Sequence, residues 1–146
     1  MQAVIQAVVA RLTADATLAS QSASGTGQTG TAVYLSRAPE GAAFPFVILE
    51  ASNAAPTEHD FPGTRITHIR IALVCVAASL QTAMAMAQRI VVLLDQTPLN
   101  LTSGILLDAA ELHSPQPLLA GASSAGGEVY RVATRFVFSV FTTLGS

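Results

Sequence analysis

The stretch Ile71–Gln88, IALVCVAASLQTAMAMAQ, decides the fold, because none of its eighteen residues is charged and its hydrophobic period changes midway. Ile71, Leu73 and Cys75 alternate with their neighbours, as in a β-strand. Hydrophobic residues then recur every three or four positions, as on one face of a helix, at Leu80, Met84, Ala87, Val91 and Leu94. The stretch is as long as a membrane span, but its change of period and its four polar side chains favour a strand followed by a packed helix.

The composition favours one domain that hides part of its surface against other proteins. Of the 146 residues, 51% are hydrophobic and 11% are charged, with no lysine and a net charge of −2. A chain of this length buries about 68% of its unfolded surface, which supports a core without disulfides. The single cysteine, Cys75, is expected to be a small buried hydrophobic residue in a reducing compartment. So little charge predicts contacts with partner proteins, and the diffuse acidic balance excludes a dedicated reader of nucleic-acid sequence.

The remaining segments predict an α+β fold in a single domain, residues 1–146. Met1–Leu12 forms an amphipathic helix without the basic start of a signal peptide, so neither a leader nor a membrane anchor is expected. Ser79 caps a second helix that runs to about Asp95. Strands are expected at Ala32–Leu35, Phe44–Ala51, Thr64–Ala77, Ile105–His113 and Glu128–Thr142, with flexible loops near 20–31, 52–64 and 114–127. The order α-β-β-β-α-β-β favours a mainly antiparallel sheet of about five strands with both helices on one face.

One glycine-rich segment matches the sequence pattern of a dinucleotide-binding motif. GTGQTG, at Gly25–Gly30, fits the pattern G-x-G-x-x-G, and Glu50 follows at the distance of a ribose-binding acid. The motif works only between a strand and a helix N-terminus, where backbone amides and the helix dipole meet a pyrophosphate. Here a Ser-rich segment precedes it and a β-prone segment ending at Pro39 follows it. We therefore interpret the segment as a loop and predict no cofactor.

Catalytic and metal-binding residues are not predicted either. A metal site needs at least three protein ligands, whereas His113 shares its expected strand face with Glu111 alone and His59 stands in a loop. The segment GASSA around Ser123 lacks the second glycine of a nucleophile elbow. Two further acids lie in a turn-rich loop rather than at the spacing of a catalytic pair, namely Glu58 and Asp60. The sequence thus predicts a protein that is not an enzyme.

Five segments, taken in order, resemble a known family of virus proteins. They are LTADATLAS (12–20), AVYLSRAPEGAAFPFVILEAS (32–52), RITHIRIALVCVA (65–77), LQTAMAMAQRIVVLLDQ (80–96) and EVYRVATRFVFSVF (128–141). Over nearly the whole chain their layout resembles the tail-terminator or tail-completion proteins, which join tail to head in long-tailed bacteriophages. The chain departs from that family in its loops 20–31 and 114–127, which are longer than a minimal member needs, and in its lack of lysine.

The resemblance implies a structural virion protein of the tail and neck that is assembled in the host cytoplasm. Six copies would form a ring on the head-proximal end of the tail tube, end tube polymerisation and dock on the connector or stopper protein of the head. The implied partners are other copies of the chain, the tail tube protein and the connector. DNA would pass through the lumen without sequence recognition, and neither a cofactor nor a membrane is implied.

A ring subunit needs two different lateral surfaces as well as two axial ones. The second half of the strand Thr64–Ala77 is apolar on both faces, so one face is available for a contact beyond the core. We expect this half-strand and the following helix to form lateral contacts through Val74, Val76, Met84 and Met86.

A basic patch is expected if the third and the last strand are neighbours. Each of these strands places two basic residues on one face, and together they are His68, Arg70, Arg131 and Arg135. Such a patch would meet acidic residues of a neighbouring subunit or face a DNA channel. The alternative is that these are ordinary solvated charges of a strand.

Two other functions stay open at the level of sequence. One is a head-completion or neck adaptor protein on the connector, which the sequence does not separate from a tail terminator. The other is a small-ligand-binding or enzymatic α+β domain, which requires a polar pocket with converging titratable groups.

Overall fold

The described part of the chain forms two long helices and a six-stranded sheet. The computed structural model describes residues 2–18, 33–37, 45–53, 64–95, 99, 101, 105–117, 121–122 and 128–143. Its elements are α1 (Gln2–Ala14), β1 (Val33–Leu35), β2 (Phe46–Asn53), β3 (Thr64–Ala77), α3 (Leu80–Leu94), β4 (Ile105–Pro117), β5 (Gly121–Ala122) and β6 (Glu128–Thr143). The predicted α+β class and the order of its main elements are confirmed.

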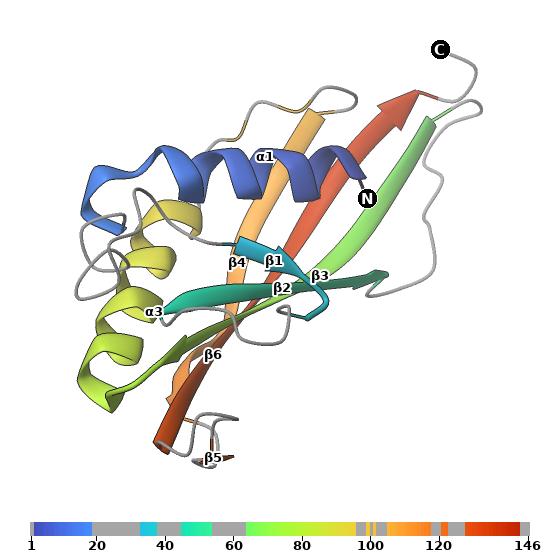
Figure 1. Ribbon diagram of the computed structural model, residues 1–146. Coiled ribbons are helices and arrows are strands. Elements are labelled where there is room, and N and C mark those ends of the chain that lie inside the picture. The colour runs from blue at the N-terminus through green and yellow to red at the C-terminus, as the bar shows by residue number, and fades with distance from the viewer. Residues whose placement is uncertain are drawn as a thin grey trace.

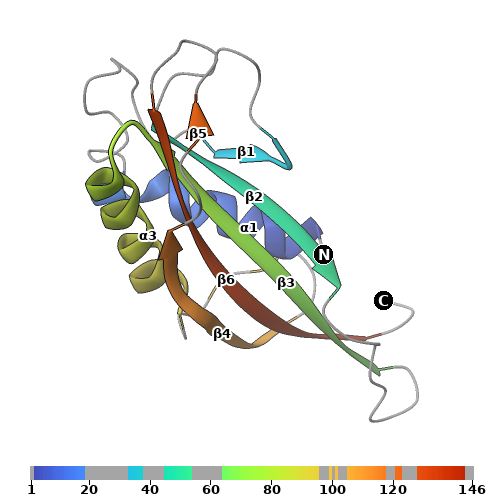
Figure 2. The same cartoon turned by 90° about the horizontal axis from the view of Figure 1, so that it is seen from below.

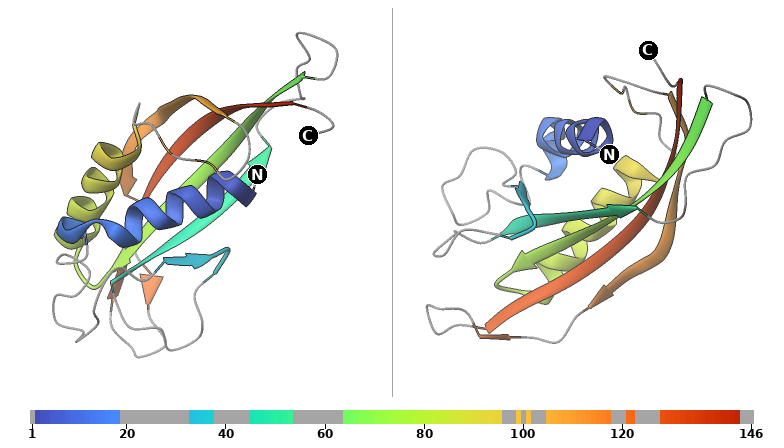
Figure 3. Two further views of the ribbon diagram at one scale, coloured as in Figure 1. Left: turned by 90° about the horizontal axis from the view of Figure 1, so that it is seen from above. Right: turned by 90° about the vertical axis from the view of Figure 1, so that its right-hand side faces the viewer.

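The sheet runs in the order β1-β2-β3-β6-β4, and β5 pairs with β6 beside this path (Figure 1). All described pairs are antiparallel except the pair of β1 and β2, which is parallel. The last strand in sequence therefore lies inside the sheet, between β3 and β4. The sheet curves around both helices, which lie on its concave face as predicted (Figure 3).

Strand register separates a face covered by the helices from an outer face. Val47 lies opposite Cys75, and Cys75 lies opposite Val132, so these three side chains point to the same side. Most of the described side chains on this face are buried, and the largest of these are Leu49, Ile69, Ile71, Leu73, Phe136 and Phe138. Burying each large apolar side chain stabilises the fold by about 1.5–3 kcal/mol. The core is thus the layer between this face and the helices.

Each helix buries one face, and one of these faces differs from the prediction. In α1, Val4, Val8 and Leu12 are buried, as the periodicity predicts. In α3 the buried set is Ala83, Met86, Ala87, Ile90 and Leu94. The predicted face contained Leu80, which is 41% exposed. The other members of the predicted face do meet the core: Ala87 and Leu94 are buried, and Met84 and Val91 pack against the core cluster.

The uncharged stretch Ile71–Gln88 divides as predicted between a strand and a helix. β3 ends at Ala77, and the hydroxyl of Ser79 accepts a hydrogen bond of 3.2 Å from the backbone N–H of Thr82, which caps α3. Cys75 is fully buried, as expected, and burial raises the pKa of its thiol to about 12. Within the described ranges, the helices are too short or too polar to cross a membrane.

Two strands extend beyond their predicted ends. β4 continues past His113 to Pro117, and β5 forms inside the expected loop 114–127. β2 continues to Asn53, into the expected loop 52–64. This part of β4 pairs with the long strand β6, and the pairing continues to Pro117 through several shifts of register. The expected loop 20–31 and the rest of the other two loops lie outside the described residues.

Candidate assembly surfaces

The outer face of the sheet carries a cluster of exposed charges over its central strands. In Figure 2 strands β2, β3 and β6 lie in front of α1, and none of the described helices covers them on this side. Register places Ala72 directly between Glu50 of β2 and Arg135 of β6. Arg70 lies in the next row of this face, opposite Val137, and is therefore diagonal to both Glu50 and Arg135. The expected adjacency of β3 and β6 brings the two arginines together.

These residues surround a hollow, which we call the outer-face hollow. Its volume is about 490 Å³, and its lining residues are Glu50, Ala51, Ser52, Arg70, Ile71, Ala72 and Arg135. Ala72 has no side chain beyond its methyl group, so the floor lies low between the longer charged side chains. Among the described residues, no ion pair or hydrogen bond joins Glu50 to either arginine. The three exposed side chains carry a net charge of +1 and are available to a partner.

The other two residues of the predicted basic patch lie farther along the same face. His68 is half-buried opposite Ser139, and its Nδ1 lies 2.9 Å from the Ser139 hydroxyl oxygen. Arg131 is exposed and lies opposite Val76, outside the outer-face hollow. The predicted patch is therefore not one continuous site: Arg70 and Arg135 line the hollow, whereas His68 and Arg131 flank it.

A small apolar cluster occupies one end of the outer face. Tyr34 and Phe46 meet edge to face, with ring centroids 5.6 Å apart. The cluster consists of Phe46, Val76 and Val129, with Tyr34, Ile48 and Val74 packed against them. The second half of β3 is thus apolar on both faces, as the sequence predicts, and Val74 is half-buried on the outer one.

The exposed side of α3 is almost free of charge. One stripe along it consists of Gln81, Ala85, Gln88 and Val92, which we call the α3 stripe. Val92 is 65% exposed, unusually so for a branched apolar residue. The single charged residue within Leu80–Leu94 is Arg89, and its side chain is already paired. A surface helix without free charge is typical of one that packs against another protein.

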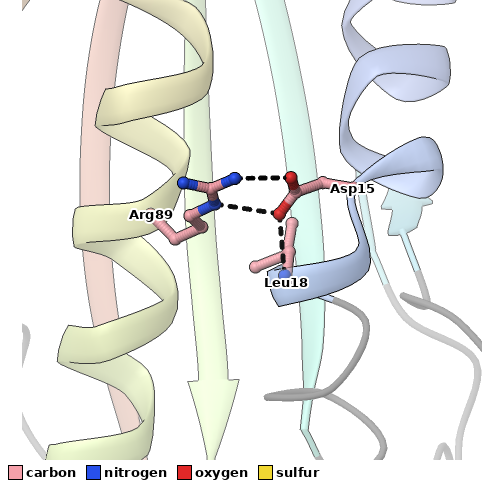
Figure 4. Close-up of polar contacts among 3 residues, drawn as sticks. All are labelled: Asp15, Leu18 and Arg89. Atoms are coloured by element: carbon pink, nitrogen blue, oxygen red, sulfur yellow. Dashed lines mark hydrogen bonds and ion pairs between the residues drawn. The ribbon is translucent and has the colours of Figure 1, made fainter.

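The partner of Arg89 is Asp15, at the end of α1 (Figure 4). Arg89 donates from Nη2 to Oδ1 of Asp15 at 2.7 Å and from Nε to Oδ2 at 2.9 Å. The backbone N–H of Leu18 donates to the same carboxylate, at 2.8 Å. The Arg89 guanidinium is the main cause that lowers the pKa of Asp15 below its ordinary value. The pair joins the end of α1 to α3, and it compensates the charge of Arg89, the single charged residue of α3.

The family model of tail completion protein gp17 matches residues 6–138. The chain belongs to this family. A tail-completion protein is a structural protein of the phage virion, and the sequence resemblance is thereby confirmed. A comparison with curated proteins finds no match.

A solved structure has the same fold as this tail-completion protein. It is a chain of the virion of the native gene transfer agent particle, with a TM-score of 0.69 and 23% sequence identity. The alignment covers 96% of both chains. The match shows that the whole fold, and not only the central sheet, is shared with that virion component.

Two of the four predicted contact residues of the tail-completion protein are buried within the subunit. Met86 is fully buried in the core, and Val76 is 1% exposed within the small apolar cluster of the outer face, so neither offers a side chain to a neighbour, and we correct both expectations. Met84 is half-buried and packs against the core cluster. That α3 contributes to a lateral contact stays a prediction, and the side chains that α3 presents outward are those of the α3 stripe.

The candidates for catalytic, cofactor or metal sites that the sequence analysis considered lie either in β4 or outside the described part of the chain. In β4, Glu111 pairs with Phe136 and His113 pairs with Arg135, and a register shift separates the two pairs. Among the described residues no three potential ligands gather as a metal site would require. The remaining candidates lie outside the described residues, namely Gly25–Gly30, Glu58, His59, Asp60 and Ser123.

Proposed function

We propose that this tail-completion protein forms a ring on the head-proximal end of the tail tube, ends tube polymerisation and joins the tail to the head connector. The observation that carries the proposal is the presence of two different surfaces on opposite sides of one sheet. One is almost free of charge, and the other carries the charged side chains of the outer-face hollow. These are the α3 stripe and the outer face. Two different surfaces suit a head-to-tail contact between copies, which closes into a ring when the rotation fits.

The proposed mechanism is geometric. One rim of the ring matches the end of the tail tube and occupies the surface on which the next tube subunit would bind. The opposite rim differs from a tube subunit, so growth ends there and the connector binds instead. We expect a hexamer. We also expect DNA to pass through the lumen without sequence recognition, since the chain has seven arginines against nine acidic residues and thus no excess of basic charge.

The polymerisation of the matching tail tube protein tests the proposal. Substoichiometric amounts of this protein, added while tubes grow, should lower the final mean length of the tubes, as measured by light scattering and electron microscopy. The mean length should fall in proportion to the protein added, because each ring blocks one end. Unchanged tube lengths together with tight binding to isolated connectors would instead favour the neck adaptor function.

A further inference from the structure

The α3 stripe and the outer-face hollow point in opposite directions within one subunit. α3 packs on the concave face of β3, β6 and β4, and its stripe faces away from the sheet. The hollow opens on the other face of the sheet, over β2, β3 and β6. A helix on one copy can therefore reach the hollow of the next copy, whereas within one subunit the sheet itself separates the two surfaces.

The charges of the two surfaces are complementary. Glu50, Arg70 and Arg135 leave the hollow with one net positive charge. The C-terminal end of a helix carries partial negative charge on its last carbonyl groups. α3 has no basic residue in its last turn to offset this partial charge. The negative end of α3 thus suits the arginines of the hollow.

The shapes and the polar groups also correspond. Ala85 and Val92 are the smaller side chains of the stripe and let it approach a sheet closely at these positions, and the floor of the hollow is the small Ala72. Gln81 and Gln88 carry amides that both donate and accept hydrogen bonds, so they can pair with an arginine or with Glu50.

We propose that the α3 stripe of one copy docks, with its C-terminal end foremost, on the outer-face hollow of the next copy. This contact rests on the proposed ring, and it assigns the two sides of the subunit–subunit interface to named residues. It leaves the tube and the connector to the axial ends of the subunit. A duplex DNA is a poorer occupant, because Glu50 lies within the same cluster and repels phosphate.

Paired cysteine substitutions test the contact without interference from the native thiol, since Cys75 is fully buried. The test pair is V92C in the α3 stripe with S52C on the wall of the hollow, treated with a short bismaleimide. The sheet prevents a link within one subunit, so every link joins two copies. We expect a ladder of linked dimers and higher species that ends at the closed ring, both in concentrated protein and on capped tubes. The matched control, Q6C with S52C, uses an exposed position of α1 and should lose the ladder.

The outcomes separate this contact from the proposed function. Oligomers that form without linking V92C to S52C, or that link Q6C instead, would overturn the contact and leave the ring intact. A linked ring that never shortens tubes would support the contact and contradict the proposed function. Linking of S52C to the tube protein or the connector, rather than to a second copy, would also overturn the contact. Protection of S52C by duplex DNA alone would count equally against it.

Discussion

Arg89 holds Asp15 through two parallel hydrogen bonds, of 2.7 and 2.9 Å, and thereby ties the middle of α3 to the end of α1. Asp15 is 11% exposed and Arg89 is 30% exposed, so the pair is only partly shielded from water. The pair leaves the outward side of α3 without a free charge within the helix. The same contact therefore contributes to the fold and shapes the surface that we assign to assembly.

Removing one member of this pair should destabilise the protein about as much as removing both. Either D15N or R89Q alone already abolishes the charge-assisted bonds, and water can solvate the partner that remains. Urea denaturation of D15N, R89Q and the double variant gives the coupling between the two positions. Strictly additive losses would show that the two side chains do not stabilise each other.

The same pair predicts a dependence of stability on pH. Arg89 lowers the pKa of Asp15 in the folded protein, so the folded state binds this proton less readily than the unfolded state does. The stabilisation is fully present above the ordinary carboxyl pKa of about 3.9 and is lost as the pH falls through the lowered value. Urea midpoints from pH 6 to pH 2 should fall less steeply for D15N than for the unmodified protein. Parallel curves would contradict the assignment.

Substitutions in α3 should separate stability from assembly. Met86 is fully buried, so M86A should lower the free energy of unfolding by about 2–5 kcal/mol through lost contacts and a cavity. Val92 is 65% exposed, so V92A should change the unfolding free energy by less than about 0.5 kcal/mol. Thermal unfolding and tube-capping assays on the two variants check this. A strong loss of stability in V92A would mean that the α3 stripe belongs to the core.

Reversing a charge in the outer-face hollow should weaken ring formation. R135E places a carboxylate where we expect the negative end of a neighbouring α3. If the arginine is desolvated in the contact, the loss is about 2–5 kcal/mol, more than a tenfold change in the association constant. The control R131E changes the same residue type on the same face of β6 but outside the hollow, and it should assemble normally. Sedimentation and tube-length measurements that find equal losses in both variants would contradict a specific role for the hollow.

The fold was predictable where local periodicity carries it, and much less so where distant segments meet. The change of period in Ile71–Gln88 located β3 and α3, and Ser79 marked the helix start. The extension of β4 to Pro117 depends on pairing with β6, which local sequence does not contain. Leu80 was wrongly assigned to the buried face of α3 because the many apolar residues of this helix make two adjacent faces look alike.

The candidate surfaces, too, were predictable only where the local sequence pattern determines them. Alternation in the strands placed Arg70 and Arg135 on outward faces, but only the register of β2, β3 and β6 adds Glu50 and leaves Ala72 at the floor between them. Met86 and Met84 were equal candidates in sequence, and packing against the sheet separates the first as core. The family followed from the layout of the whole chain, which requires no catalytic motif.

Electron cryomicroscopy of tail tubes grown with this protein tests the central claim most directly. We predict one ring of this chain at a single end of each tube, with α3 of each subunit against the outer sheet face of its neighbour. Bare tube ends of unrestricted length, with the protein monomeric in the background, would contradict the account.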